Sequence, residues 1–189
     1  MTSARHMLAF CAASALAVMP GIAAAQDCLT ETEVSAMAVY AMPGLVQGVQ
    51  LRCAGHLAAD GFITRGGATL SARYVRLQPT EWPQAKSGLL KIAARKASKA
   101  ASGPSAKARS GNADMMQMIA SLPDGAVRPL VDALIVQEVA PQIDVKQCGK
   151  IELLMQALSG IDPAVAGTLL GLIAGLVKLD DPAICGAPV

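Results

Sequence analysis

The sequence predicts an all-α protein, built as a single-domain irregular helical bundle stabilised by two disulfides. Three observations lead to this fold class. Apolar residues recur at helical spacing along most of the chain, no segment alternates apolar and polar residues between hairpin turns, and four cysteines remain beyond an N-terminal leader. With 53% hydrophobic and 16% charged residues, the composition also excludes a disordered chain.

Residues 1–25 are predicted to form a secretory signal peptide. A basic start is followed by an uncharged run over residues 7–19 and by small residues at positions 23–25. This run is shorter than the roughly 20 apolar residues that a membrane-spanning helix needs. We therefore expect export to the periplasm and a mature helical domain over residues 26–189, without a transmembrane helix.

The cysteines predict the covalent framework. Cys11 lies in the leader, so the mature chain keeps Cys28, Cys53, Cys148 and Cys185. In an oxidising compartment these four are expected to form two disulfides, for which three connectivities are possible. We favour the local pairs Cys28–Cys53 and Cys148–Cys185, because each pair brackets a candidate helical hairpin.

The first helix is predicted to begin at residues 30–33, because Thr-Glu-Thr-Glu is a capping box. The following apolar stripe is interrupted by Pro43-Gly44 and resumes over residues 45–57. If the helix ran unbroken, Cys28 and Cys53 would lie about 37 Å apart. The favoured disulfide therefore requires a turn at Pro43-Gly44.

The middle of the chain predicts two more helices and a linker. A flexible Gly66-Gly67 precedes an apolar stripe over residues 70–77, and a second stripe over residues 89–93 follows two prolines. Residues 100–112 are rich in Ala, Ser and Gly and lack any stripe. We expect them to form a mobile linker.

The last third predicts three helices. The first carries an apolar stripe over residues 127–135 and ends at Pro141, the second begins at Asp144, and the third begins at Pro163. The last of these contains Gly167, Gly171 and Gly175.

The glycines of the last helix recur every four residues, and this leaves a smooth face that another backbone can approach closely. Interior glycines cost a helix about 1 kcal/mol each relative to alanine, so packing must compensate. We expect Gly167, Gly171 and Gly175 to mark a buried central helix. An oligomer seam or membrane association is the alternative.

Charge is distributed unevenly. The net charge is −3 over residues 26–64, +9 over residues 65–113 and −5 over residues 114–189. A basic middle segment of this kind predicts an anionic partner, either an envelope component or another periplasmic protein. The alternative is that the cations solvate a helix and a linker. The candidate binding residues are Arg65, Arg73, Arg76, Lys91, Arg95 and Lys99.

The inventory of chemical groups does not indicate an enzyme. His56 is the single histidine of the mature chain, and its neighbour Cys53 is expected to be oxidised, so no metal site is predicted. No nucleophile elbow, Ser-x-x-Lys pair or Cys-x-x-Cys motif is present. We predict no catalytic residues and no cofactor, and two aromatic residues in the basic segment are too few to predict nucleic-acid binding.

These observations leave three functional hypotheses, with the oligomeric state open. The leading one is a non-enzymatic envelope protein that binds an anionic partner or surface through the basic segment. The second is a carrier of small apolar ligands, and the third is an enzyme acting on cell-wall material, which rests on location alone. The methionines that we expect to line a carrier cavity are Met37, Met42, Met115, Met116, Met118 and Met155.

Several short motifs resemble a loose group of small exported proteins from alphaproteobacteria to which no function has been assigned. They are Cys28 after the leader, the Tyr-Ala-Met-Pro of residues 40–43 before Cys53, the Ala-Arg-Tyr of residues 72–74, and the late pair Cys148 and Cys185. The resemblance spans most of the mature chain. It implies no activity and no functional residues.

Overall fold

The computed structural model describes residues 28–101, 121–177 and 183–185. Within these residues the chain is all-α, as predicted, and forms no strand; a single β-bridge joins Leu29 to Ile184. The predicted signal peptide lies outside the described residues. The helices are α1 (Glu31–Cys53), α2 (Phe62–Val75), α3 (Gln78–Ala101), α5 (Asp124–Gln142), the short 3-10 helix η1 (Val145–Gln147), α6 (Cys148–Ser159) and α7 (Pro163–Leu176).

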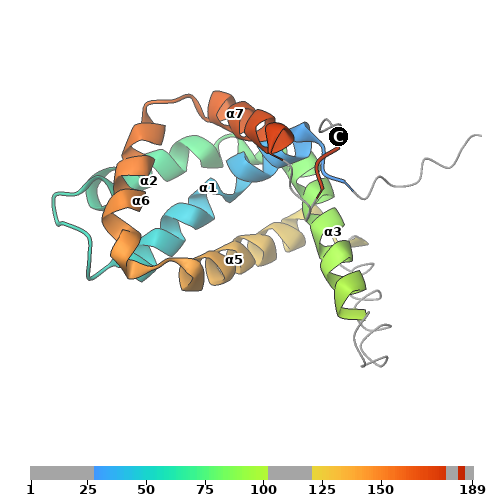
Figure 1. Cartoon of the computed structure of the whole chain (residues 1–189), viewed down its shortest axis with the longest axis horizontal. Coiled ribbons are helices and arrows are strands. Elements are labelled where there is room, and N and C mark those ends of the chain that lie inside the picture. Colours follow the sequence, from blue (N-terminus) through green and yellow to red (C-terminus); the bar gives the residue numbers. More distant parts are fainter. Residues whose placement is uncertain (1–27, 102–120, 178–182, 186–189) are drawn as a thin grey trace, which may run out of the picture.

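Helix α1 is the centre of the bundle. It begins with the predicted capping box, in which the Thr30 hydroxyl accepts from the Glu33 N–H and the Glu33 carboxylate accepts from the Thr30 N–H. Helices α2, α3, α5 and α7 all pack on it (Figure 1). The prediction of a central glycine helix is therefore wrong, because α7 lies at the edge of the bundle.

The predicted turn at Pro43-Gly44 is also wrong, since α1 continues through both residues. A proline inside a helix removes one backbone hydrogen bond and costs about 3 kcal/mol. Apolar side chains on both sides of Pro43 are buried in the main core, among them Val39, Val46 and Val49. Each contributes roughly 1.5–3 kcal/mol, so burial of an unbroken helix outweighs the cost of the proline.

The continuous helix overturns the favoured disulfide pairing. At 1.5 Å per residue, a 23-residue helix separates its ends by roughly 35 Å, so Cys28 and Cys53 cannot bond to each other. Instead Cys28 pairs with Cys185 and Cys53 pairs with Cys148, with Cα–Cα distances of 5.1 and 5.8 Å. One bond joins the two ends of the described chain, and the other ties the end of α1 to the start of α6.

Two predicted breaks lie inside helices. Helix α2 runs through Gly66-Gly67, and α3 includes Pro83 and extends to Ala101. The rest of the predicted linker over residues 100–112 lies outside the described residues.

Helix α7 packs on the first half of α1 through its glycine face. A Cβ atom on Gly171 would lie 2.6 Å from the backbone oxygen of Glu31, and one on Gly167 would lie 3.0 Å from the Ser35 hydroxyl. The close backbone approach predicted from the glycine spacing is thus confirmed. The opposite side of the helix is exposed and apolar, with Val165, Leu169, Leu170, Leu172, Ile173, Leu176 and Val177.

Glu33 is the buried charge that joins α1 to α3. Its side chain accepts hydrogen bonds from Ser87 Oγ at 2.7 Å and from Lys91 Nζ at 2.8 Å, in addition to the Thr30 N–H. Lys91 also donates to the backbone oxygen of Cys28. Burial opposes the ionisation of Glu33, but the bonds from Lys91, Ser87 and Thr30 outweigh it, so its pKa lies below the ordinary 4.5.

The disulfide pattern predicts a specific peptide map. Digestion of the oxidised protein without reductant should release fragments joined through Cys28–Cys185 and Cys53–Cys148, detected by mass spectrometry. Because each bond closes a long loop, replacing one pair by serines should lower the free energy of unfolding by roughly 3–5 kcal/mol. Recovery of a Cys28–Cys53 fragment would contradict the pairing.

The glycine face predicts a steric penalty. Gly171→Val should lower the free energy of unfolding by roughly 2–3 kcal/mol, because the new side chain overlaps the α1 backbone at Glu31. Denaturant titration followed by circular dichroism measures the change. The neighbouring exposed variant Leu172→Ala should cost less than about 1 kcal/mol, and equal losses in the two variants would refute the close contact.

The lowered pKa of Glu33 predicts that its contribution to stability depends on pH. The ionised side chain stabilises the fold above about pH 4.5, and this contribution is lost as the pH falls through the lower pKa of the folded state. At pH 7, Glu33→Gln should therefore be less stable than the wild type by roughly 2–3 kcal/mol. Denaturant titrations at pH 7 and pH 3 should show this gap narrowing in acid.

The control for this experiment is Glu138→Gln, which alters a carboxylate that is 70% exposed and 3.9 Å from Lys96. Its stability should stay within about 0.5 kcal/mol of the wild type at both pH values. A Glu33→Gln gap of the same size at pH 7 and pH 3 would exclude a role for Glu33 ionisation.

Candidate functional site

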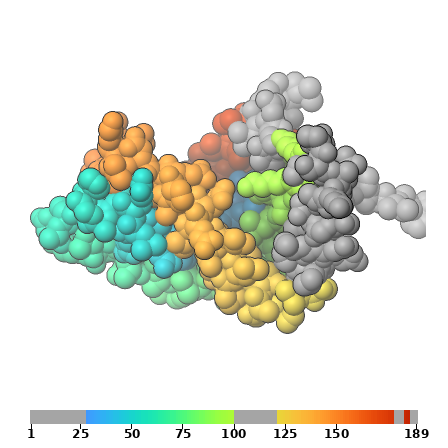
Figure 2. Space-filling model, turned by 90° about the horizontal axis from the view of Figure 1, so that it is seen from below, coloured from blue at the N-terminus to red at the C-terminus, as the bar shows by residue number. Residues whose placement is uncertain are grey.

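An apolar groove between α3 and α5 is the strongest candidate for a binding site. It has a volume of about 350 Å³, within the range of small-molecule pockets. Figure 2 shows α5 crossing the face that is seen from below. The lining is mostly aliphatic and consists of Trp82, Lys86, Leu89, Leu90, Ile92, Ala93, Lys96, Val127, Leu130, Val131, Leu134, Ile135 and Glu138.

The groove exists because two amphipathic helices face each other without filling the space between them. Trp82 from α3 and Val127 from α5 are both buried in a second core cluster, separate from the main core, whose other members are Ala36, Tyr40 and Ala85. Farther out, Leu130 and Leu134 of α5 remain 44% and 51% exposed. Large half-exposed aliphatic side chains around a concave surface are typical of sites that take apolar ligands.

Charged groups lie among the lining residues. Lys86 forms an ion pair with Asp124 at 3.0 Å, and the Trp82 indole together with Lys86 lowers the pKa of the Asp124 carboxyl. Lys96 lies 3.9 Å from Glu138, and its side chain is 73% exposed. Lys86 is therefore held by a close partner, whereas Lys96 is the more loosely paired cation of the groove.

Two of the six candidate basic residues have structural roles. Arg73 donates hydrogen bonds to the backbone oxygens of Ser159, the last residue of α6, and of Ile161, two residues farther along the chain. Lys91 is bound to Glu33 and to the backbone of Cys28. Both cations are thereby engaged in holding helices together.

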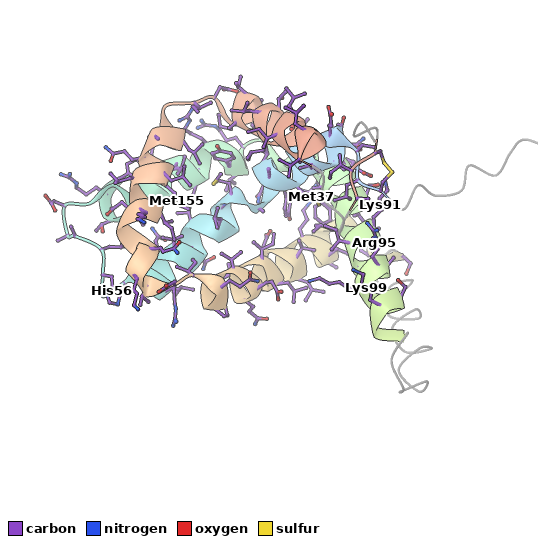
Figure 3. All side chains as sticks on the ribbon, viewed as in Figure 1. Met37, His56, Lys91, Arg95, Lys99 and Met155 are labelled. Carbon is purple, nitrogen blue, oxygen red and sulfur yellow. A yellow bond between two sulfur atoms is a disulfide. The ribbon has the colours of Figure 1, made fainter. Side chains whose placement is uncertain are left out.

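The other four candidates are divided between two helices. Arg65 and Arg76 are exposed near the two ends of α2, while Arg95 and Lys99 follow Lys91 along α3 (Figure 3). The start of α2 and the end of α3 lie at opposite sides of the molecule (Figure 1). The structure thus distributes the basic segment over two separate regions.

The methionines do not form the expected cavity in the described part of the chain. Met42 and Met155 are buried in the main core, and Met37 packs beside Gly88. Met37 and Met155 also lie far apart along the bundle (Figure 3). Three other predicted lining residues, Met115, Met116 and Met118, lie outside the described residues.

His56 and Cys53 do not form a metal site. Cys53 is bonded to Cys148, and His56 is exposed in the turn after α1. Over residues 28–101, 121–177 and 183–185, no group of three or more histidine, cysteine or acidic side chains has an arrangement that holds a metal ion.

One described helix, α1, has the length and mean hydropathy of a membrane span. The segment Val145–Ser159, which comprises η1 and α6, reaches the same threshold only when it is taken together with α7, and the two are bent by 117° where they meet. Because α1 packs on four other helices, its apolar character is that of a central bundle helix.

Sequence reasoning missed the groove between α3 and α5, although both apolar stripes that form it were recognised. The available signal was the width of the apolar stripe on α5. This stripe covers more of the helix surface than one neighbouring helix can bury, and it consists of Val127, Leu130, Val131, Leu134 and Ile135.

Comparison of the chain with protein-family models, curated proteins and solved structures finds no match. The function has to be inferred from the chemistry of the groove and of the surrounding surface.

Proposed function

We propose that the protein is a non-enzymatic binding protein of the periplasm that takes an amphiphile, with its acyl chain in the groove between α3 and α5 and its anionic head beside Lys96. Two disulfides support an oxidising, extracytoplasmic environment. The periplasm and the removal of residues 1–25 are the more specific part of this proposal. The proposal combines the two leading hypotheses from the sequence, an anionic partner and an apolar ligand. It places the binding site in the groove between α3 and α5.

The observation that carries the proposal is the chemistry of the lining. Nine of the thirteen lining residues are alanine, valine, leucine or isoleucine, and Trp82 adds an aromatic wall. A long, flexible apolar chain can cover such a surface without needing hydrogen bonds, and each buried methylene contributes about 0.8 kcal/mol. A polar ligand would gain little there.

Lys96 supports an anionic head. Its ammonium group is largely exposed, and its distance of 3.9 Å from Glu138 leaves only a weak ion pair. Arg95 and Lys99 are further cations near the end of the same helix. A carboxylate or phosphate head is attracted to this end.

The exposed side of α7 supports the same class of ligand. Val165 is 58% exposed and Leu176 is 79% exposed, and α7 contains no charged residue. Soluble monomers rarely expose so continuous an apolar face. A protein that exchanges acyl chains with a membrane needs such a face in order to approach the bilayer.

A fluorescence titration tests the proposal, because Trp82 is the single tryptophan of the chain and lines the groove. Laurate below its micelle-forming concentration should change the Trp82 emission in a saturable way in the oxidised mature protein. Leu134→Glu should weaken binding at least about tenfold, because it places a charge in the apolar lining.

The matched control is Leu172→Glu, since Leu172 is 49% exposed on α7 and Leu134 is 51% exposed in the groove. This variant should bind laurate like the wild type. Lys96→Glu should weaken laurate binding by roughly three- to fivefold and leave dodecanol binding unchanged. Equal binding by the Leu134 and Leu172 variants, or no change in emission, would refute the proposal.

A further inference from the structure

The cleft between α1 and α2 is larger and more polar than the groove, with a volume of about 620 Å³. It is open because small residues of α2 face α1, among them Gly67, Ala68 and Ala72. A Cβ atom on Gly67 would lie 3.0 Å from the side-chain nitrogen of Gln50, so this amide extends across the glycine. The cleft shares no lining residue with the groove.

Side chains from four helices bring hydrogen-bonding groups to this cleft. Gln47 and Gln50 come from α1, Ser71 from α2, Gln78 from the start of α3 and Asp132 from α5. Within the described part of the chain, no hydrogen bond engages the side chains of Gln47, Gln50 or Ser71. Each amide offers two donors and an acceptor, so the lining can bind groups of the same kind.

Gln78 is fixed in place, because its side-chain nitrogen donates to the backbone oxygen of Tyr40 at 2.9 Å. Its side-chain oxygen is left as an acceptor for a donor in the cleft. The lining therefore combines one oriented amide with two amides that are free to adjust.

Asp132 is the single ionisable residue of the lining. Burial raises the pKa of the Tyr40 phenol and the neighbouring Asp132 carboxylate raises it further, so Tyr40 stays protonated beside this carboxylate. The nearest cation on the same helix, Arg128, lies over the Trp82 ring at 5.3 Å and does not line the cleft. Arg128 also acts electrostatically on Tyr40, so the negative charge of the lining itself is that of Asp132, which disfavours anions there.

We infer that this cleft is a second binding site, which takes a short neutral or cationic peptide. Its peptide groups pair with Gln47, Gln50, Ser71 and Gln78, and a basic side chain or terminal amine pairs with Asp132. The lining carries no aromatic ring on which a sugar would stack, and this favours a peptide over a glycan. The inference is independent of amphiphile binding.

Nuclear magnetic resonance titration of the oxidised mature protein tests this site. The probes are three acetylated, amidated tripeptides, Lys-Ala-Ala, Ala-Ala-Ala and Glu-Ala-Ala, together with tri-N-acetylglucosamine. The side-chain amide signals of Gln47, Gln50 and Gln78 should shift with the peptides, with affinity falling from the lysine to the alanine to the glutamate peptide. The lysine peptide should bind at least about threefold more tightly than the glutamate peptide.

Two variants make the test specific. Ala72→Leu fills the cleft and should abolish the shifts, whereas Ala157→Leu makes the same change at an exposed position of α6 and should preserve them. Asp132→Asn should bring the affinities for the lysine and glutamate peptides together. Absence of shifts at millimolar peptide, unchanged binding by Ala72→Leu, or binding of the trisaccharide alone would overturn the inference.

Discussion

The constraint on which the rest of the structure depends is the continuity of α1 through Pro43. The helix is long enough to touch almost every other element, so four helices pack on it and its residues take part in both core clusters. Its first turn holds the Glu33 carboxylate and its last residue is Cys53. Because the helix is rigid, it fixes which cysteines can meet and which helices flank each cavity.

Local features of the fold could be predicted from the sequence, but the contacts that they make with distant parts of the chain could not. The capping box at Thr30 and the apolar stripes depend on residues three or four positions apart, so the pattern contains them. The turn at Pro43 was wrong because a local preference of about 3 kcal/mol was outweighed by burial against distant helices. The disulfide pairing failed with it, since it depended on that turn.

The same difference between local patterns and contacts formed by folding applies to the candidate site. A count of charges along the chain finds the basic segment but does not reveal that Arg73 is bound to backbone oxygens and Lys91 to a buried carboxylate. Apolar stripes on α3 and α5 could be read from their period, yet the volume left between them depends on how α1 sets their spacing. The polar cleft was not predicted, because Gln47 and Gln50 of α1 meet Ser71, Gln78 and Asp132 only in the folded chain.

The nested order of the disulfides has a consequence for how the protein matures. When the N-terminal part of the chain is exposed to an oxidant first, Cys28 and Cys53 encounter it before Cys148 and Cys185. A disulfide between Cys28 and Cys53 would be a non-native one. Formation of α1 keeps these two thiols far apart, so an early helix prevents mispairing before either correct partner has emerged. Sequence changes that slow the winding of this segment should therefore increase the need for an isomerase, even where the finished protein is no less stable.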